Sequence, residues 1–182
     1  MKLIILDRDG VINSDSDAFI KSPDEWQPIP GSLEAIASLN HAGYRVVVAS
    51  NQSGIARGLF AIDTLNAIHH KLYEQLEQLG GHIDALFFCP HGPDDGCDCR
   101  KPKPGMFVQI AQRFHCELTG VYAIGDSLRD LQAAERAGAD PILVRTGKGH
   151  TTEEHADFNT EIPVFDNLSM AVASLLSGES LA

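Results

Sequence analysis

Long hydrophobic runs, a surplus of basic residues and a dense cysteine framework are all absent from this sequence of 182 residues. No apolar run approaches the roughly 20 residues that a membrane-spanning helix needs, and Asp7 interrupts the N-terminal run too early for a signal peptide. We therefore expect a cytoplasmic protein with no membrane partner. The net charge of −11 also argues against nucleic acid as a partner, because binding a duplex requires clustered Lys and Arg.

The chain is long enough for one domain with a sizeable core, and its 43% hydrophobic and 21% charged residues are ordinary for a globular protein. Neither an internal repeat nor a linker divides it, so we predict a single domain over residues 1–182. Three of its four cysteines lie within eleven positions. In a reducing compartment, such clustering favours a metal site over disulfides.

Five short apolar runs alternate with segments of helical periodicity. The runs cover residues 3–6, 46–49, 85–89, 121–124 and 141–144, and the helical segments cover 33–40, 62–79, 106–114, 128–137 and 168–176. This alternation predicts the α/β class, a doubly wound parallel sheet with helices on both faces. Ligands of such sheets bind outside the carboxyl ends of the strands, so the residues after each run are the candidates for function. Residues 145–163 show no assignable pattern.

Acidic residues follow two of these runs. Asp7 and Asp9 come directly after the first run with Gly10 behind them, and Asp126 comes after the fourth run and Gly125. Paired carboxylates can hold Mg²⁺ or act as a nucleophile and an acid/base group. Asp130, one turn into the next helix, is a candidate for indirect support. Taken singly, each Asp is also a normal loop former or helix cap, and only the combination favours chemistry.

Two further strand-end loops carry groups that suit a phosphate. Ser50 and the polar residues after it can donate hydrogen bonds to phosphoryl oxygens, and Lys101 can neutralise charge. The prolines around Lys103 stiffen this second loop. An ordinary polar turn and a solvated basic loop remain the alternative interpretations of the two segments.

A second metal site is indicated by the loop over residues 89–101. Cys89, His91, Cys97 and Cys99 have the residue types and spacing of a closed tetrahedral zinc site, which would be structural because no position remains for water. Buried or free cysteines with a surface histidine are the alternative. We expect zinc to fix the geometry of Arg100 and Lys101, which follow directly, and we expect Cys116 to pack in the core.

Together these motifs resemble those of the haloacid dehalogenase (HAD) superfamily of phosphatases. Its pattern is D-x-D-G after the first strand, Ser or Thr after the second, then a Lys, and then G-D with an Asp downstream. The matching residues, in the same order along this chain, are Asp7 and Asp9, Ser50, Lys101, and Gly125-Asp126 with Asp130. The resemblance implies a HAD or Rossmann-like fold. With only about twenty residues between Asp9 and Leu33, no large cap domain is expected.

The resemblance also implies a mechanism. Asp7 would attack phosphorus and form an aspartyl-phosphate, while Asp9 would protonate the leaving oxygen and then activate water. Mg²⁺ would bind Asp7, the main-chain carbonyl of Asp9, and Asp126. Ser50 and Lys101 would stabilise the transferred group. Positioning and charge neutralisation of this kind carry most of phosphoryl transfer.

The zinc-loop motifs and the segment N-Q-S-G-I-A-R-G resemble one branch of the superfamily. This branch contains D-glycero-D-manno-heptose-1,7-bisphosphate 7-phosphatases, and histidinol-phosphatases are close relatives. It implies removal of the 7-phosphate of a small sugar bisphosphate on the way to nucleotide-activated heptose and lipopolysaccharide precursors. The substrate contacts that it implies are Asp15, Ser16, Asp17, Ala18, Asn51, Gln52, Ser53, Arg57 and Arg100.

Three other functions stay open at this point. Histidinol phosphate is the alternative substrate, because Asp15 and Asp17 could meet its positive amine. A catalytically inactive binding module shaped by zinc is a different class, which the intact set of acidic residues argues against. Processing of polynucleotide ends is a third, which the net charge of −11 disfavours. We expect a monomer.

Overall fold

The computed structural model describes residues 1–178. Its elements in chain order are β1 (Lys2–Leu6), α1 (Ser32–His41), β2 (Tyr44–Asn51), α2 (Ile62–Gln78), β3 (Ala85–Cys89), α3 (Gly105–Phe114), β4 (Tyr122–Gly125), α4 (Leu128–Ala137), β5 (Asp140–Val144), α5 (Gly149–Glu153), β6 (Val164–Phe165) and α6 (Leu168–Ser177). The predicted α/β class is confirmed, since each apolar run forms a strand and each periodic segment forms a helix. None of the helices in this part of the chain is both long and apolar enough to cross a bilayer.

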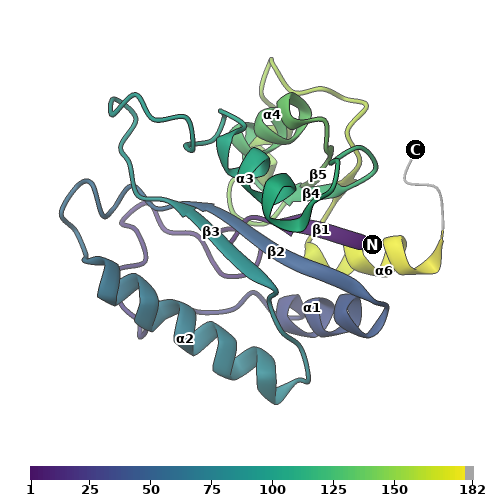
Figure 1. Ribbon diagram of the computed structural model, residues 1–182, viewed down its shortest axis with the longest axis horizontal. Helices are drawn as coiled ribbons and strands as arrows, with labels where there is room; N and C mark the ends of the chain where they lie inside the picture. The colour runs from purple at the N-terminus through teal and green to yellow at the C-terminus, as the bar shows by residue number, and fades with distance from the viewer. Residues whose placement is uncertain (179–182) are drawn as a thin grey trace.

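The strands form one parallel sheet in the order β3-β2-β1-β4-β5-β6 (Figure 1). The chain starts at β1 near the centre, builds outward to β3, and then returns to place β4 on the other side of β1. The strand order therefore reverses between β1 and β4. Loops leave this point toward opposite faces of the sheet, and the crevice between them is the usual ligand site of such folds.

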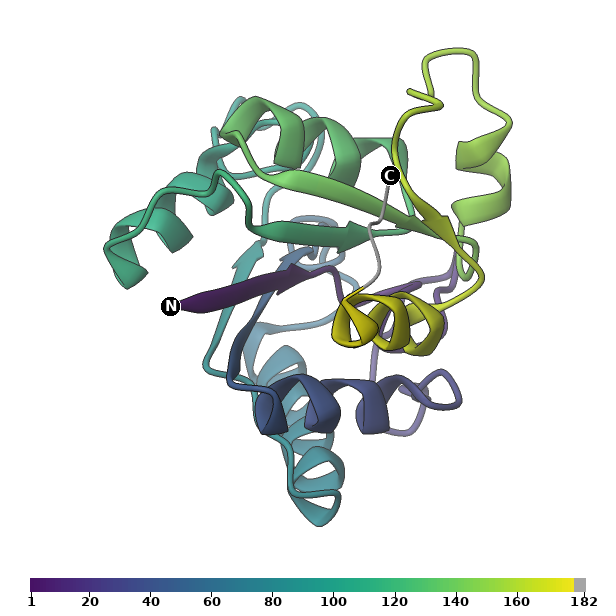
Figure 2. The ribbon, with the colours of Figure 1, turned by 90° about the vertical axis from the view of Figure 1, so that its right-hand side faces the viewer.

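Alternating side chains of each strand feed two separate cores. Ile4 and Leu6 of β1 pack into a cluster with residues of α1, α2 and α6, whereas Leu3 and Ile5 pack into a cluster with residues of α3 and α4. Figure 2 shows the corresponding helices on the two sides of the sheet. Burying an aliphatic side chain contributes roughly 1.5–3 kcal/mol, so both faces hold the sheet rigid beneath its loops.

Two elements lie in the region for which the sequence showed no pattern. Helix α5 has five residues and β6 has two, both too short to produce a recognisable period. Strand β6 extends the sheet, because its two residues pair with Leu143 and Val144 of β5. Strand β2 also runs further than predicted, since Ser50 and Asn51 pair with the end of β3. Ser50 thus lies within the strand rather than after it.

The connection from β1 to α1 is a folded loop and not a cap domain. Residues 7–31 contain only turns and single β-bridges, including Asp9 to Asn13 and Asn13 to Pro28. Trp26 anchors this loop with a fully buried side chain. The site at the carboxyl ends of the strands is therefore bordered by loops and by the first turn of α4, and not by a cap domain.

Candidate active site

The two predicted acidic positions meet at the point where the strand order reverses. The main-chain N–H of Asp7 donates to the carbonyl of Ile124 at 2.9 Å, which continues the pairing of β1 with β4. Asp126 follows β4 directly. As a result, carboxylate oxygens of Asp7, Asp126 and Asp130 all lie within 4.8 Å of one another.

Glycines allow this close approach. Gly10 has φ +83° and Gly147 has φ +59°, and a Cβ added at either position would collide with Oδ2 of Asp126. Both positions therefore need glycine for the backbone angle and for the space. The Asp126 carboxylate is fixed in turn by the main-chain N–H of Lys148, which donates to Oδ2 at 2.8 Å. Thr152 of α5 donates to the main-chain carbonyl of Asp126 at 2.9 Å.

The charge of this cluster suits a divalent cation. Burial raises the pKa of Asp7 to about 7; Lys101 opposes the rise, and the charges of Asp130 and Asp9 add to it. Burial and the charges of Asp130 and Asp7 likewise raise the pKa of Asp126 to about 8. A bound cation would offset the repulsion between these crowded carboxylates and favour their charged forms. Mg²⁺ binds one or two carboxylates together with further oxygen ligands. The donor set of Asp7 and Asp126 therefore fits Mg²⁺.

Asp130 is committed elsewhere. Its Oδ2 accepts hydrogen bonds from the N–H and the hydroxyl of Ser127, at 3.0 and 2.6 Å, and so caps α4. Its Oδ1 lies 2.6 Å from Nζ of Lys101. Although burial opposes ionisation, Lys101 and Ser127 hold the pKa of Asp130 below its usual range. Asp130 thus contacts Lys101 as well as capping α4, and the indirect role expected for it stays a prediction.

Lys101 reaches the acidic cluster from the loop after β3. Its side chain is only 2% exposed, and its Nζ contacts Oδ1 of Asp7 at 3.0 Å and the carbonyl of Ala49 at 2.7 Å. Asn51 fixes the main chain of Lys101, accepting from its N–H and donating to its carbonyl, both at 3.1 Å. Asn51 was predicted to touch substrate, and it also borders the cavity described below.

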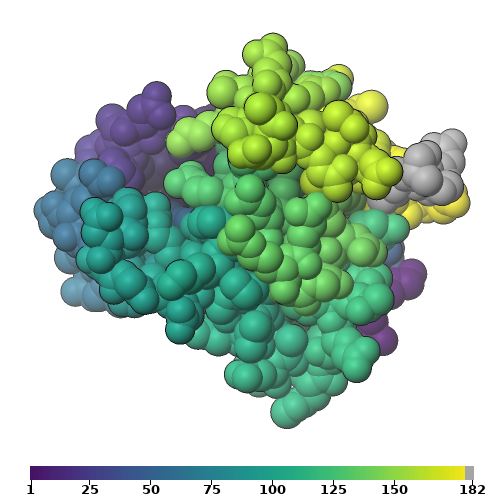
Figure 3. All heavy atoms as spheres, turned by 90° about the horizontal axis from the view of Figure 1, so that it is seen from above, coloured from purple at the N-terminus to yellow at the C-terminus, as the bar shows by residue number. Residues whose placement is uncertain are grey.

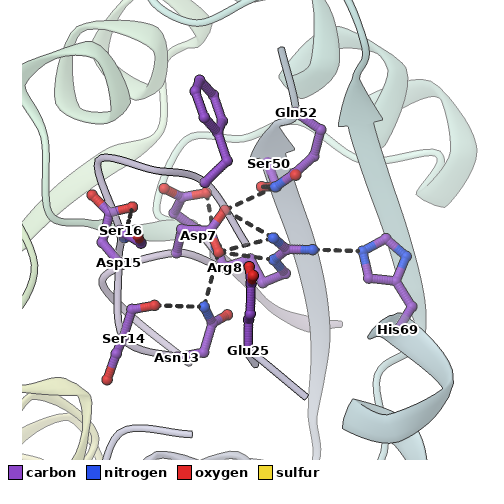
Figure 4. A network of polar contacts seen from close by, with 12 residues as sticks. Asp7, Arg8, Asn13, Ser14, Asp15, Ser16, Glu25, Ser50, Gln52 and His69 are labelled. Atoms are coloured by element: carbon purple, nitrogen blue, oxygen red, sulfur yellow. Dashed lines mark hydrogen bonds and ion pairs between the residues drawn. The ribbon is translucent and has the colours of Figure 1, made fainter. Parts of the chain in front are cut away.

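The carboxylate of Asp9 accepts hydrogen bonds from three side chains. Arg8 donates to Oδ1 at 2.9 Å and to Oδ2 at 3.0 Å, Asn13 donates to Oδ1 at 2.8 Å, and Gln52 donates to Oδ2 at 2.8 Å. Figure 4 shows the Arg8 guanidinium at the centre of this network, with His69 on its far side. Burial opposes the charge on Asp9, but Arg8, Asn13 and Gln52 hold its pKa below the usual range.

A cavity of about 200 Å³ opens over these groups. Figure 3 views the molecule from above, where the purple N-terminal segment, the teal segment and the yellow-green segment come together. Every predicted substrate-contact residue lines the cavity except Ala18, which is exposed beside it. Asp7, Asp9, Lys101 and Asp126 also line it. Ser50 does not: it is 1% exposed, and its hydroxyl accepts from Gln52 at 2.8 Å.

The rim of the cavity carries unequal charges. Arg57, Arg100 and Arg129 all line it, and among residues 1–178 no carboxylate forms an ion pair with any of them. Partial burial and then the charges of Arg129 and Arg57 lower the pKa of Arg100. Lys148, Asp15 and Asp17 also line the cavity, and Nζ of Lys148 lies 3.2 Å from Asp15 and 3.9 Å from Asp17.

Sequence reasoning missed Arg129 and Lys148 of the cavity and the Arg8–His69 pair beneath it. Arg129 sits between two assigned aspartates, and its position in the first turn of α4 was the available signal. Lys148 lies in the unassigned region. The roles of Arg8 and His69 had no signal along the chain, because the two residues lie 61 positions apart and meet only in the folded chain.

The four predicted zinc ligands converge as one cluster. Sγ of Cys89 lies 3.1 Å from Sγ of Cys99 and 3.6 Å from Sγ of Cys97, and Nδ1 of His91 lies 3.3 Å from Sγ of Cys99. The edges of a tetrahedron with zinc–sulfur and zinc–nitrogen bond lengths are about 3.5–3.8 Å, so the cluster is near that size. Burial raises the pKa of Cys89 to about 12, which a bound cation would counteract.

Cys116 lies apart from this cluster. It is partly buried against the core formed with α3 and α4, as predicted.

Comparison with known proteins identifies the family. A family model described as HAD-hydrolase-like matches residues 98–171. The D-glycero-β-D-manno-heptose-1,7-bisphosphate 7-phosphatase of Bordetella bronchiseptica is 59% identical over 97% of this chain and 98% of its own length, and the Pseudomonas putida enzyme of that name is 53% identical over 97% and 100%.

A crystal structure agrees with these matches. The D,D-heptose 1,7-bisphosphate phosphatase of B. bronchiseptica, solved with magnesium and phosphate, superposes with a TM-score of 0.96 at 58% identity, covering 98% of this chain and 100% of that one. The chain belongs to the HAD-like hydrolases, in the family of these heptose-bisphosphate 7-phosphatases.

Proposed function

We propose that this chain hydrolyses the 7-phosphate of D-glycero-D-manno-heptose 1,7-bisphosphate. The supporting observation is the set of three arginines, Arg57, Arg100 and Arg129, which line the same cavity as Asp7 and form no ion pair with any carboxylate of residues 1–178. Arginine is suited to binding phosphate through several donors at once. A substrate with two phosphates fits this arrangement, since one phosphate would lie at Asp7 and the second would lie near the three arginines.

Histidinol phosphate fits the same cavity less well. Its amine would require free carboxylates, and the two predicted for that purpose, Asp15 and Asp17, face Lys148 instead. The three arginines would repel a positive amine. The relatives named above act on heptose bisphosphate, which supports the same choice.

The proposed mechanism has two half-reactions. In the first, an oxygen of Asp7 attacks phosphorus while the ester bond to the sugar oxygen breaks, and Asp9 gives a proton to that oxygen. This step requires Asp9 to be protonated in the substrate complex, although Arg8 and its other donors favour the ionised form in the structure. In the second, Asp9 takes a proton from water, whose oxygen attacks phosphorus and releases Asp7. Lys101 stabilises the charge on the phosphoryl oxygens and on Asp7 throughout, and proton transfer by a group such as Asp9 is worth roughly 10²–10⁴-fold.

Mg²⁺ completes this proposal. Asp7 and Asp126, whose oxygens lie close together, would hold it with the main-chain carbonyl of Asp9. When bound, it supplies neutralisation of the phosphate charge that the buried carboxylates alone would repel. Ser50 acts through Gln52 in this arrangement, because its hydroxyl accepts from Gln52, which in turn holds Asp9.

We also propose that Cys89, His91, Cys97 and Cys99 bind a structural zinc ion. Its role is to hold the loop after β3, whose next two residues are Arg100 and Lys101. The loop otherwise loses considerable conformational entropy when Lys101 is buried. Arg100 is tied to the same loop, since it donates to the carbonyl of His91 at 3.2 Å.

The wider assignment follows from the reaction. We propose a place in the synthesis of nucleotide-activated heptose for lipopolysaccharide precursors, with a cytoplasmic location. The monomeric state stays a prediction.

Phosphorus NMR of the purified protein with heptose bisphosphate and Mg²⁺ tests the proposal directly. We expect loss of the 7-phosphate signal, retention of the 1-phosphate signal, and much slower release from histidinol phosphate. Asp7→Asn should abolish release, and Arg129→Ala should raise KM for the bisphosphate more than for a heptose 7-monophosphate. Turnover by Asp7→Asn, or equal effects of Arg129→Ala on both substrates, contradicts the assignment.

A further inference from the structure

The Arg8 guanidinium joins the proposed acid/base group to a histidine outside the cavity. Arg8 is fully buried, and one edge of its guanidinium faces Asp9, with Nε at 3.1 Å and Nη2 at 2.9 Å from Oδ1. The other nitrogen, Nη1, lies 3.2 Å from Nε2 of His69. His69 is on α2 and is 6% exposed. Figure 4 shows the contact between the Arg8 guanidinium and the His69 ring as a dashed line.

The direction of this second contact is fixed by chemistry. Arginine has donors only, so Nε2 of His69 must be the acceptor and the ring proton must sit on Nδ1. A protonated ring would instead place two positive groups in contact. Burial and the charge of Arg8 lower the pKa of His69 to about 4, which agrees with a neutral ring. The ring is also steadied by Phe88, whose centroid lies 6.3 Å away.

We propose that His69 is a positioning residue for the phosphatase reaction, acting through Arg8 to orient the carboxyl group of Asp9. The proposal rests on the function proposed above. A planar guanidinium held at both ends has one orientation, and its Asp9 edge then sets the plane in which the carboxyl group faces the cavity. Without the His69 acceptor, Arg8 has a buried donor with no partner and can rotate toward other acceptors. His69 does not line the cavity, so substrate binding should be unaffected.

Substitutions at His69 can separate the acceptor from its bulk. The Oε1 atom of a glutamine can occupy roughly the place of Nε2, whereas an asparagine places its oxygen near Nδ1 and cannot reach Arg8. His69→Gln should therefore keep the function, and His69→Asn should lose it. His70→Asn is the matched control, because the neighbouring His70 is exposed and its ion-pair partner is the exposed Glu74 at 3.2 Å.

The ratio of kcat/KM for two substrates with different leaving groups tests the role of Asp9. A general loss of structure would lower both values and leave this ratio unchanged. A sugar alkoxide needs a proton from Asp9, whereas the p-nitrophenolate of p-nitrophenyl phosphate is a good leaving group without one. For His69→Asn we expect kcat/KM to fall about 10- to 100-fold for heptose bisphosphate, part of the acid/base contribution, and less than about threefold for p-nitrophenyl phosphate. KM should change little, and His69→Gln should restore most of the loss.

The outcomes are distinct. If wild type releases phosphate from neither compound, the proposed function fails. If wild type acts on both but His69→Asn lowers the two values equally, or His69→Gln is as impaired as His69→Asn, the inference about His69 is wrong. In an Asp9→Asn background, His69→Asn should have no further effect on the ratio of the two values; a persisting effect would also overturn it.

Discussion

Lys101→Met should both destabilise and inactivate the protein, because it removes the buried contacts of the Lys101 ammonium group. Nζ of Lys101 lies 3.0 Å from Asp7, 2.6 Å from Asp130 and 2.7 Å from the carbonyl of Ala49. Burial alone would lower the pKa of Lys101, but the charges of Asp130 and Asp7 outweigh it and raise that pKa. The ammonium group is therefore charged, and its removal leaves two buried carboxylates without a cation.

The magnitude follows from these distances. At an effective dielectric constant of about 20, each pair near 3 Å contributes roughly 5 kcal/mol before desolvation. Desolvation cancels much of this, and breaking a buried pair by removing one partner costs about 3–5 kcal/mol. We expect the free energy of unfolding to fall by about that amount. The value of kcat should fall at least about 100-fold, as when a single group that stabilises transition-state charge is removed.

Urea denaturation followed by circular dichroism, without added Mg²⁺, measures the first effect, and phosphate release measures the second. Lys103→Met is the control, because Lys103 is exposed and pairs with Asp98, which is 94% exposed; it should cost less than about 1 kcal/mol. Lys101→Met with Asp130→Asn should recover part of the stability but none of the activity. A cost for Lys101→Met as small as that of Lys103→Met would refute the reasoning.

Three further predictions concern the supporting structure. Cys97→Ser should remove about one equivalent of zinc per chain by elemental analysis and lower activity, whereas Cys116→Ser should retain both; zinc-free protein with full activity would contradict the structural role. The pKa of His69, about 4 in the fold against 6.5, means that its contribution to stability is complete above pH 6.5 and is lost as the pH falls toward 4. Between pH 7 and pH 5 wild type should lose about 2 kcal/mol more of unfolding free energy than His69→Gln, and equal losses would show that the ring does not titrate as inferred. Gly147→Ala should weaken Mg²⁺ binding by calorimetry and destabilise more than Gly120→Ala, which shares a positive φ but has open space at its Cβ; equal effects would exclude crowding against Asp126.

Hydrophobic periodicity and the order of the motifs along the chain were enough to predict the fold class and the acidic residues that meet in the site. Short apolar runs cannot form stable helices, and their alternation with periodic segments leaves a parallel sheet as the arrangement that buries both. The topology then sends the strand ends to one edge, which is why Asp7 and Asp126 could be paired from sequence although 118 residues separate them. The close spacing of Cys89, His91, Cys97 and Cys99 likewise predicted their convergence, since a loop this short keeps them together.

Tertiary structure alone decided the partners of these groups. Nothing along the chain pairs Asp130 with Lys101, Asn51 with the backbone of Lys101, or His69 with Arg8, because each contact depends on the packing of separate elements. The segment that holds Asp126, with Lys148 and Thr152, carries no recognisable period because α5 has five residues and β6 has two. The local sequence pattern is enough to predict a helix or strand, because a few residues determine which face is buried. The orientation of a buried charged side chain depends on all of its neighbours, and these are brought together only by the tertiary structure.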